Sequence, residues 1–253
     1  MIASEPAFEN FVALSFLPGR VHTLVGAGGK SSCMSAVAGI LSRKGLRVRI
    51  TTTTRIGIEE FSAHPVALVR SRGDFLSSLA AEAPVQVISA GLLAADGKHR
   101  GVAADLIERV TLPPDLLLLV EGDGSRKMPM KAPRAHEPVI PGSSAVVFAF
   151  MGASAFDEKV GSENCYNPEG VLALLGSEEA IFDVPTLLLL AGHPGGCRKG
   201  VLPGMGFRLI VTMGDLADKR QTASRLLREV RRLHGIPSTL LSLREQRIYE
   251  TAW

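Results

Sequence analysis

The stretch "RVHTLVGAGGKSS" (residues 20–32) places an apolar strand-type run directly before a cluster of glycines. A Lys-Ser-Ser sequence follows the glycines and opens a segment whose apolar residues recur at helical spacing, which predicts a helix over 31–45. This order is typical of a phosphate-binding loop, but the usual pattern has a glycine five residues before Gly29, where this chain has Leu24. The stretch therefore leaves two interpretations open: a phosphate-binding loop, or a glycine-rich turn with a helix-capping serine.

The functional interpretation rests on local chemistry. Glycines allow backbone N–H groups to converge on phosphate oxygens, and a helix N-terminus adds positive potential. In this interpretation Lys30 neutralises phosphate charge and acts in catalysis, while the hydroxyl of Ser31 reaches Mg²⁺. The predicted nucleotide-binding residues of the loop are Gly26, Ala27, Gly28, Gly29, Lys30, Ser31 and Ser32.

Strand-type and helical segments alternate along the rest of the chain. This alternation predicts an α/β fold with three layers, a mostly parallel central sheet with helices on both faces, similar to P-loop NTPases. We predict one nucleotide-binding domain over 1–253, with a long functional loop at 122–143. Strand signals lie within 20–25, 46–54, 66–69, 85–89, 115–125, 144–152, 207–215 and 238–243, and helical signals within 31–45, 74–82 and 216–234. The run "VPTLLLLAGH" (184–193) fits a helix or a strand.

The composition is that of a soluble α/β protein. Hydrophobic residues make up 46% of the chain, and the net charge of +3 is too small to indicate nucleic-acid binding. The three cysteines are far apart and suit a reducing compartment. The start "MIASEPAFENF" lacks the basic residues of a signal peptide, and the apolar runs are too short for a membrane span. We expect a cytoplasmic protein that binds neither membrane nor nucleic acid.

Acidic residues follow the most apolar strand signal, "LLLLVEGDGS" (116–125). Glu121 and Asp123 lie at the end of a predicted buried parallel strand. Magnesium ligands and catalytic groups of nucleotide-binding proteins occupy the same position. An acidic turn is the alternative, because Asp-Gly-Ser favours turns by itself.

Four threonines, Thr51–Thr54, end the second predicted strand. β-Propensity accounts for threonine in a strand. Hydroxyl groups at the carboxyl end of a strand also suit contacts with phosphate or a magnesium-bound water, and on this interpretation Thr53 binds the nucleotide.

Four stretches together resemble the YqeC family of selenium-dependent hydroxylase accessory proteins. They are "LVGAGGKSS" (24–32), "RVRITTTTRI" (47–56), "LLVEGDGSRKMPMKAPRAHEPVIP" (118–141) and "HPGGCRKG" (193–200). Within the third, Gly122 replaces the alanine usual in the family. The resemblance implies a P-loop-type protein that binds a nucleoside triphosphate and takes part in the maturation of molybdenum-containing hydroxylases.

The resemblance gives the 122–141 loop a role beside the phosphates. Its cations would stabilise transferred charge and its acids would hold metal. The resulting assignments are catalysis for Lys131, His136 and Glu137, and nucleotide binding for Arg126; a solvated loop is the alternative.

Members of the family often carry Asn-Lys-x-Asp after a later strand, similar to the guanine-reading motif of GTPases. This chain has Thr212, Met213, Gly214 and Asp215 there. The aspartate expected to contact the nucleotide, Asp215, is present, whereas the asparagine and the lysine are replaced. We expect ATP or GTP with Mg²⁺, and ATP slightly in preference.

Three functions remain open. The first is a Mg²⁺-dependent NTP hydrolase or phosphotransferase acting in hydroxylase maturation, with an apo molybdenum hydroxylase or a cofactor-maturation protein as partner. The second is a nucleotide-gated chaperone or scaffold that delivers a cofactor without hydrolysis. The third is an ATP-dependent ligase similar to the Mur enzymes, which are much longer than 253 residues.

Overall fold

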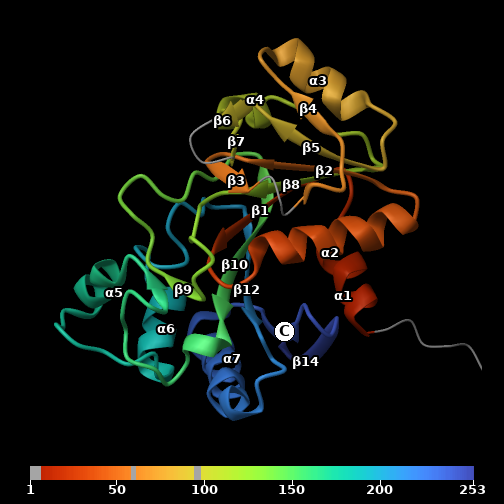
Figure 1. Ribbon diagram of the computed structural model, residues 1–253. Coiled ribbons are helices and arrows are strands. Elements are labelled where there is room, and N and C mark those ends of the chain that lie inside the picture. The colour runs from red at the N-terminus through yellow and green to blue at the C-terminus, as the bar shows by residue number, and fades with distance from the viewer. Residues whose placement is uncertain (1–6, 58–60, 94–97) are drawn as a thin grey trace, which may run out of the picture. The chain divides into compact units, whose positions relative to one another are not determined.

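The computed structural model describes residues 7–57, 61–93 and 98–253 (Figure 1). The first six residues of the amino-terminal stretch considered above lie outside these ranges. The chain forms two compact units, each built from segments distant in sequence. The first comprises Met1–Leu24, Ser31–Gly124 and Val139–Val146, and the second comprises Val25–Lys30, Ser125–Pro138 and Val147–Trp253. The single nucleotide-binding domain inferred from the sequence stays a prediction.

Hydrogen bonds join nine strands into one sheet in the order β14-β13-β12-β10-β1-β8-β2-β5-β4. The pairs β1–β8, β8–β2, β2–β5, β5–β4 and β12–β13 are parallel, whereas β14 runs antiparallel to β13 at the edge. The predicted α/β fold with a mostly parallel sheet is therefore confirmed.

In its described residues, the first unit contains four helices and most of the parallel strands. The helices are α1 (Ala7–Ser15), α2 (Lys30–Arg43), α3 (Arg72–Ala80) and α4 (Ala104–Glu108). The strands are β1 (Val21–Gly26), β2 (Arg47–Thr52), β3 (Arg55–Gly57), β4 (Val66–Leu68), β5 (Val85–Ser89), β6 (Gly91–Leu93), β7 (Lys98–Arg100) and β8 (Leu116–Glu121). Strands β3, β7 and β6 form a small antiparallel sheet.

The second unit contains the remaining elements. Its helices are α5 (Pro168–Leu175), α6 (Val184–Gly192) and α7 (Arg220–His234), with 3-10 turns at Ala153–Ala155 and Ala217–Lys219. Its strands are β9 (Met130–Lys131), most of β10 (Ser144–Gly152), β11 (Cys165–Tyr166), β12 (Gly206–Thr212), β13 (Ser238–Ser242) and β14 (Arg247–Ala252).

Strand β8 forms the centre of the first unit because all six of its residues are buried. Leu116, Leu118 and Val120 pack in one cluster with side chains of α3 and α4. The alternate residues Leu117 and Leu119 point to the other face, where α2 lies in Figure 1. Helices therefore cover both faces of this part of the sheet, and a strand buried on both faces needs the continuous apolar run that the sequence has.

Two arginines at the start of β2 bind the carbonyl groups that end α3. Arg49 is fully buried and donates to the carbonyl oxygens of Ser78 at 2.8 Å, of Ala83 at 2.9 Å and of Ala81. Its neighbour Arg47 donates to the Asp115 carboxylate at 2.7 and 3.0 Å. Burial lowers the pKa of the Arg49 guanidinium to about 10, so it remains charged at neutral pH. Arg49 thus satisfies helix-end carbonyls that would otherwise be buried without a partner.

The ambiguous run at 184–193 is a helix, α6. The carboxylate of Asp183 accepts from the amide of Thr186 at 3.0 Å, and a proline stands in the first turn, so both N-terminal helix signals are present. Helix α7 begins at Arg220, four residues after the predicted start of its helical signal, because a 3-10 turn precedes it. It buries Ala223, Leu226, Leu227 and Val230.

Several short elements were not predicted: α1, α4, α5, β14, the β3-β7-β6 sheet and the β9–β11 pair. None of the helices in the described ranges is long and apolar enough to cross a membrane.

Replacing Arg49 by methionine should lower the free energy of unfolding by about 2–4 kcal/mol, because several buried carbonyl groups lose their donor. Urea denaturation followed by circular dichroism measures this change. The control is Arg43→Met, since that arginine is exposed and pairs with Glu9 at 3.4 Å, and it should cost no more than about 0.5 kcal/mol. Equal effects of the two substitutions would contradict the role given to Arg49.

Candidate phosphate-binding site

The glycine loop connects β1, which ends at Gly26, to α2, which begins at Lys30. Strand, loop and helix therefore occur in the predicted order. Backbone contacts fix the path of the loop within the second unit. A Cβ atom on Gly26 would lie 2.5 Å from the carbonyl oxygen of Phe150, and one on Gly28 would overlap the backbone of Gly152. Gly28 also has a φ of +89°, which a side chain disfavours.

Two hydrogen bonds hold the loop to neighbouring strands. The amide of Ala27 donates to the carbonyl of Phe150 at 3.0 Å, and the hydroxyl of Thr212 donates to the carbonyl of Gly28 at 2.5 Å. The loop is thereby attached to the end of β10 on one side and to the end of β12 on the other. Its conformation is therefore set by contacts with these strands.

The amide groups of Gly28 and Gly29 have no hydrogen-bond partner anywhere in the described part of the chain. Gly28 is buried, so an unpaired amide there is costly unless an acceptor binds it. Lys30 is only 3% exposed, and its ammonium group donates to the carbonyl oxygen of Gly26 at 2.5 Å. Adjacent N–H groups of this kind, with a lysine at the start of the following helix, form a binding site suited to an anion.

The two predicted loop serines lie in the first turn of α2. Ser31 is half-buried and Ser32 is exposed. A hydroxyl in a first helical turn can bind a ligand together with the unpaired amides there. The magnesium contact of Ser31 and the nucleotide contact of Ser32 stay predictions.

The predicted metal-binding acids belong to the first unit. Glu121 is the last residue of β8 and lies opposite Thr52 of β2 and Leu24 of β1 in the sheet register. Its exposure is 6%, and that of Asp123 is 1%. Both supply the carboxylate oxygens that Mg²⁺ prefers. No group of three or more His, Cys, Asp or Glu residues in the described ranges is arranged to hold a metal ion by itself.

The threonines at the end of β2 and just after it use their hydroxyl groups to support the backbone. Thr53 donates to the carbonyl oxygen of Val139 at 2.7 Å, and Thr51 to that of Ile88 at 2.9 Å. Thr52 donates to the carbonyl of Glu121 at 2.9 Å. The contact of Thr53 with Val139 places the end of the 122–138 segment, while its nucleotide contact stays a prediction.

The structure brings together two of the predicted catalytic residues of the long loop. The Lys131 ammonium group lies 2.8 Å from a carboxylate oxygen of Glu137, and their side chains are only 1% and 9% exposed. The same carboxylate accepts from the amide of Arg134 at 3.3 Å. His136 is exposed and makes no hydrogen bond or ion pair with another described residue, so it lies apart from this pair. The catalytic roles of all three predicted residues stay predictions.

Sequence reasoning did not identify Tyr166, the residue around which the cations of this loop gather. Its ring centroid lies 5.4 Å from the Arg126 guanidinium, 5.1 Å from the Lys131 ammonium and 4.7 Å from the Arg134 guanidinium. Tyr166 reaches them because β11 pairs with β9. No sequence signal marks that two-residue pairing.

Asp215 lies in the second unit just after β12, and its carboxylate is already paired. It lies 2.7 Å from the Arg244 guanidinium, and the side chain of Arg244 is 77% exposed. A hydrogen bond from Ser242, and then the charges of Arg244 and Arg220, hold the pKa of Asp215 below its ordinary value. The carboxylate is therefore ionised at neutral pH. Its nucleotide contact stays a prediction.

Two similarities identify the family of this chain. The model of the YqeC protein family matches residues 22–169. A protein of Escherichia coli (strain K12) described as "Uncharacterized protein YqeC" is 36% identical over 186 residues, which is 73% of this chain and 72% of that protein. The chain belongs to the YqeC family. The resemblance stated from the sequence is confirmed, and the family match includes the glycine loop, both predicted metal-binding acids and Tyr166, but not Asp215.

Among solved structures, HypB from Helicobacter pylori in complex with nickel is similar at 11% identity and a TM-score of 0.35, over 95% of this chain and 85% of that chain.

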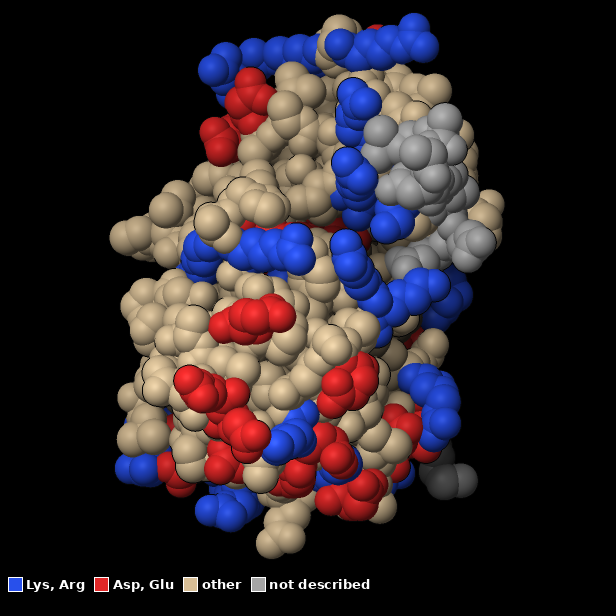
Figure 2. Space-filling view, turned by 60° about the vertical axis from the view of Figure 1, so that its left-hand side comes forward, with Lys and Arg blue, Asp and Glu red and all other residues tan. Residues whose placement is uncertain are grey.

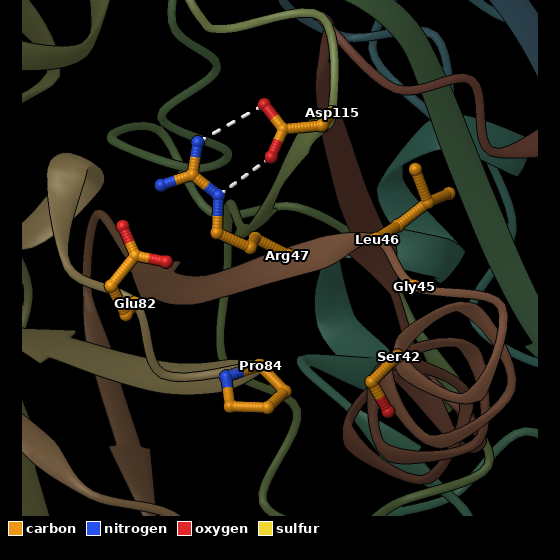
Figure 3. A pocket seen from close by; sticks show the side chains of 7 residues that line it. All are labelled: Ser42, Gly45, Leu46, Arg47, Glu82, Pro84 and Asp115. Atoms are coloured by element: carbon orange, nitrogen blue, oxygen red, sulfur yellow. Dashed lines mark hydrogen bonds and ion pairs between the residues drawn. The ribbon is translucent and has the colours of Figure 1, made fainter.

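A pocket of about 370 Å³ lies in the first unit of this YqeC protein, away from the carboxyl ends of its strands (Figure 3). It is lined by the start of β2 at Arg47, the residue before β8 at Asp115, and Glu82 and Pro84 before β5. Two of its charged groups form the Arg47–Asp115 pair drawn in Figure 3, and Glu82 supplies a further carboxylate. Ligands of parallel sheets bind at the opposite, carboxyl ends of strands, so we do not assign the nucleotide to this pocket.

The buried Lys131–Glu137 pair can be tested by a double-mutant cycle. Glu137→Gln leaves a buried ammonium group without a carboxylate and should cost about 3–5 kcal/mol of unfolding free energy, whereas Lys131→Met with Glu137→Gln should cost less than the two single changes together. Urea denaturation of the four proteins gives the coupling energy. The exposed pair Lys159–Glu179, with its groups 3.2 Å apart, is the control and should couple by less than about 1 kcal/mol. Equal coupling in the two pairs would show that burial adds nothing.

Proposed function

We propose that this YqeC protein binds the phosphates of a nucleoside triphosphate through the glycine loop, Gly26–Lys30. The observation that carries the proposal is the pair of unpartnered amides, on Gly28 and Gly29, in a loop whose backbone is fixed by two strands. Lys30 supplies the positive charge, and the start of α2 supplies further amides and a favourable dipole. These groups match the oxygens and negative charge of a phosphate chain.

Magnesium accompanies the nucleotide in this proposal. Ser31, Glu121 and Asp123 offer the oxygen donors that this ion prefers, and Mg²⁺ bound to phosphates usually keeps several waters, so few protein ligands are required. When bound, the ion would neutralise charge on the phosphate oxygens. The chain's own contribution is the placement of the phosphates by the loop and the positive charge of the buried Lys30 ammonium group.

ATP is the expected nucleotide in preference to GTP. A carboxylate that reads guanine accepts hydrogen bonds from the base, and the carboxylate of Asp215 already accepts from Ser242 and Arg244. Thr212, at the asparagine position of the guanine-reading pattern, uses its hydroxyl on the carbonyl of Gly28. Because the side chains of Asp215 and Thr212 already have these partners, we expect the site to discriminate only weakly against adenine.

The reaction that we propose is NTP hydrolysis or phosphoryl transfer, in support of the maturation of selenium-dependent molybdenum hydroxylases. Membership of the YqeC family supports the pathway, and the glycine loop supports the chemistry. The partner would be an apo-hydroxylase or a protein that matures its cofactor. Bound nucleotide without turnover, alone and with the partner, would favour a nucleotide-gated scaffold; ADP formed only with an amine acceptor would favour a ligase.

Lys30→Ala should weaken binding of Mg²⁺-ATP about a hundredfold, because a charge-assisted contact to phosphate is lost. Isothermal calorimetry measures the affinity, and circular dichroism confirms that the variant is folded. Lys30→Met retains the buried aliphatic part and serves as a second variant if alanine disturbs the fold. Lys44→Ala changes an exposed lysine just after α2 and should leave the affinity unchanged. Wild-type affinity in both Lys30 variants would refute the phosphate-binding role of the loop.

A further inference from the structure

Three cations of the second unit surround the ring of Tyr166, and we call Arg126, Lys131, Arg134 and Tyr166 the Tyr166 cluster. Glu137 offsets the charge of Lys131, with which it pairs at 2.8 Å. The two guanidinium groups have no ion-pair partner in the described ranges. The cluster and its one acid therefore carry a net charge of +2.

The two neighbouring charged groups, Lys199 and Glu169, have opposite charges and leave this net charge unchanged. Lys199 adds another ammonium group, which donates to the carbonyl oxygens of Arg134 at 2.5 Å and Ala135 at 3.0 Å. Glu169 is close enough to influence the thiol of Cys165, but it makes no ion pair with a described residue. Like charges gathered around one ring repel one another, and the cation–π attraction of an exposed site is only about 0.5–1 kcal/mol per contact. An anion bound there would remove that repulsion.

The donors of the cluster match one kind of anion. Each guanidinium group presents a planar set of N–H donors that fits two oxygens of a phosphate or a carboxylate. The hydroxyl of the half-buried Tyr166 has no hydrogen-bond partner in the described part of the chain and can add a further donor. Two uncompensated positive charges and donors on three side chains suit a phosphate group, which carries up to two negative charges and three terminal oxygens, better than a carboxylate.

The cluster is connected to the glycine loop through one short stretch of chain. The amide of Gly152 donates to the carbonyl of Pro129 at 2.8 Å, and that carbonyl lies within 3.0 Å of the position of a Cβ on Gly28. Lys131 follows Pro129 by two residues. The glycine loop has its own amides and its own lysine, so the Tyr166 cluster supplies a separate set of donors for an anion.

Basic side chains are unevenly distributed on the protein surface. On the face drawn in Figure 2, Lys and Arg side chains form several groups, and most of the Asp and Glu side chains gather in separate groups. A chain with a net charge of only +3 can therefore present strongly positive regions. Such regions attract anionic ligands.

We propose that the Tyr166 cluster binds the phosphate group of a second substrate, a phosphorylated molecule other than the nucleotide of the glycine loop. Arg126 and Arg134 bind the phosphate oxygens. Lys131 is held beside them by Glu137 and contributes charge, and Tyr166 fixes the directions of the cations and donates its hydroxyl. This proposal does not depend on nucleotide binding, because its donors are distinct from those of the glycine loop.

The test uses the full chain and inorganic phosphate as the probe, with binding measured by ³¹P NMR titration. In wild-type protein saturated with Mg²⁺-ADP, phosphate should bind, and Arg126→Ala with Arg134→Ala should weaken it at least tenfold. Both arginines are exposed, so the double variant should stay folded, which circular dichroism checks. Tyr166→Phe should weaken phosphate binding by a smaller factor, since it removes a single donor.

The matched control removes the same charge elsewhere in the second unit. Arg225 and Arg247 are exposed, and the Arg247 guanidinium lies 4.9 Å from the centroid of the Tyr249 ring, whose hydroxyl donates to Glu245. Arg225→Ala with Arg247→Ala should leave phosphate binding unchanged. Equal losses in the two double variants would reduce the effect to overall charge and overturn the proposal.

A further arm separates this site from the glycine loop. Phosphate should still bind to Lys30→Ala protein in the absence of nucleotide. Binding that is lost in Lys30→Ala and unaffected by the two cluster substitutions would assign the phosphate to the glycine loop, which overturns this proposal and supports nucleotide binding. Absence of phosphate binding in the wild type would also overturn it. If every variant, Lys30→Ala included, keeps its affinity for Mg²⁺-ATP, that result would count against the role of the glycine loop alone.

Discussion

Close backbone packing around Gly28 is the constraint on which the candidate site depends. A side chain at this position would overlap Gly152, so the turn after β1 can approach β10 only with glycine. That approach brings the carbonyl of Gly28 to the hydroxyl of Thr212 and leaves the amides of Gly28 and Gly29 without a partner among the described residues. A glycine-rich turn that only reverses the chain would not require its backbone to pack so closely. Leu24 stands where the usual pattern has a glycine. It is a fully buried residue of β1 that precedes the loop, so its side chain belongs to the core of the strand.

The parts of the fold that the sequence predicted are those with strong local signals. The continuous apolar run of β8 requires burial on both faces, and the helical spacing after Lys30 gives α2 an apolar side. Edge and two-residue strands escaped prediction because they bury little and depend on a partner: β14 is mostly half-exposed, and β9 and β11 exist only as a pair. The run at 184–193 is equally apolar in either conformation, and the capping by Asp183 together with the proline in the first turn identifies it as a helix.

The candidate site shows the same division. The glycine loop is contiguous in sequence, so its order of strand, turn and helix was predictable. Tyr166 was not, because 32 residues separate it from Arg134 and their contact depends on the pairing of two short strands. The sequence also could not show how the hydroxyl of Thr53 is used, since its acceptor is the carbonyl of Val139, far along the chain. The role of a side chain that lies in a loop thus depends on tertiary contacts that residue type alone does not specify.

Burial explains why the three cations of the long loop differ from one another. Lys131 is almost fully buried, and its ammonium group is stabilised by the nearby carboxylate of Glu137. Arg126 and Arg134 remain in contact with water, where the solvation of a guanidinium group makes a carboxylate partner unnecessary. The loop therefore fixes one cation by pairing and leaves two exposed beside an aromatic ring that limits their directions. Exposed guanidinium groups beside a ring, with no ion-pair partner among the described residues, can accept an anion directly, whereas a cluster in which every cation is already paired would first have to break those pairs.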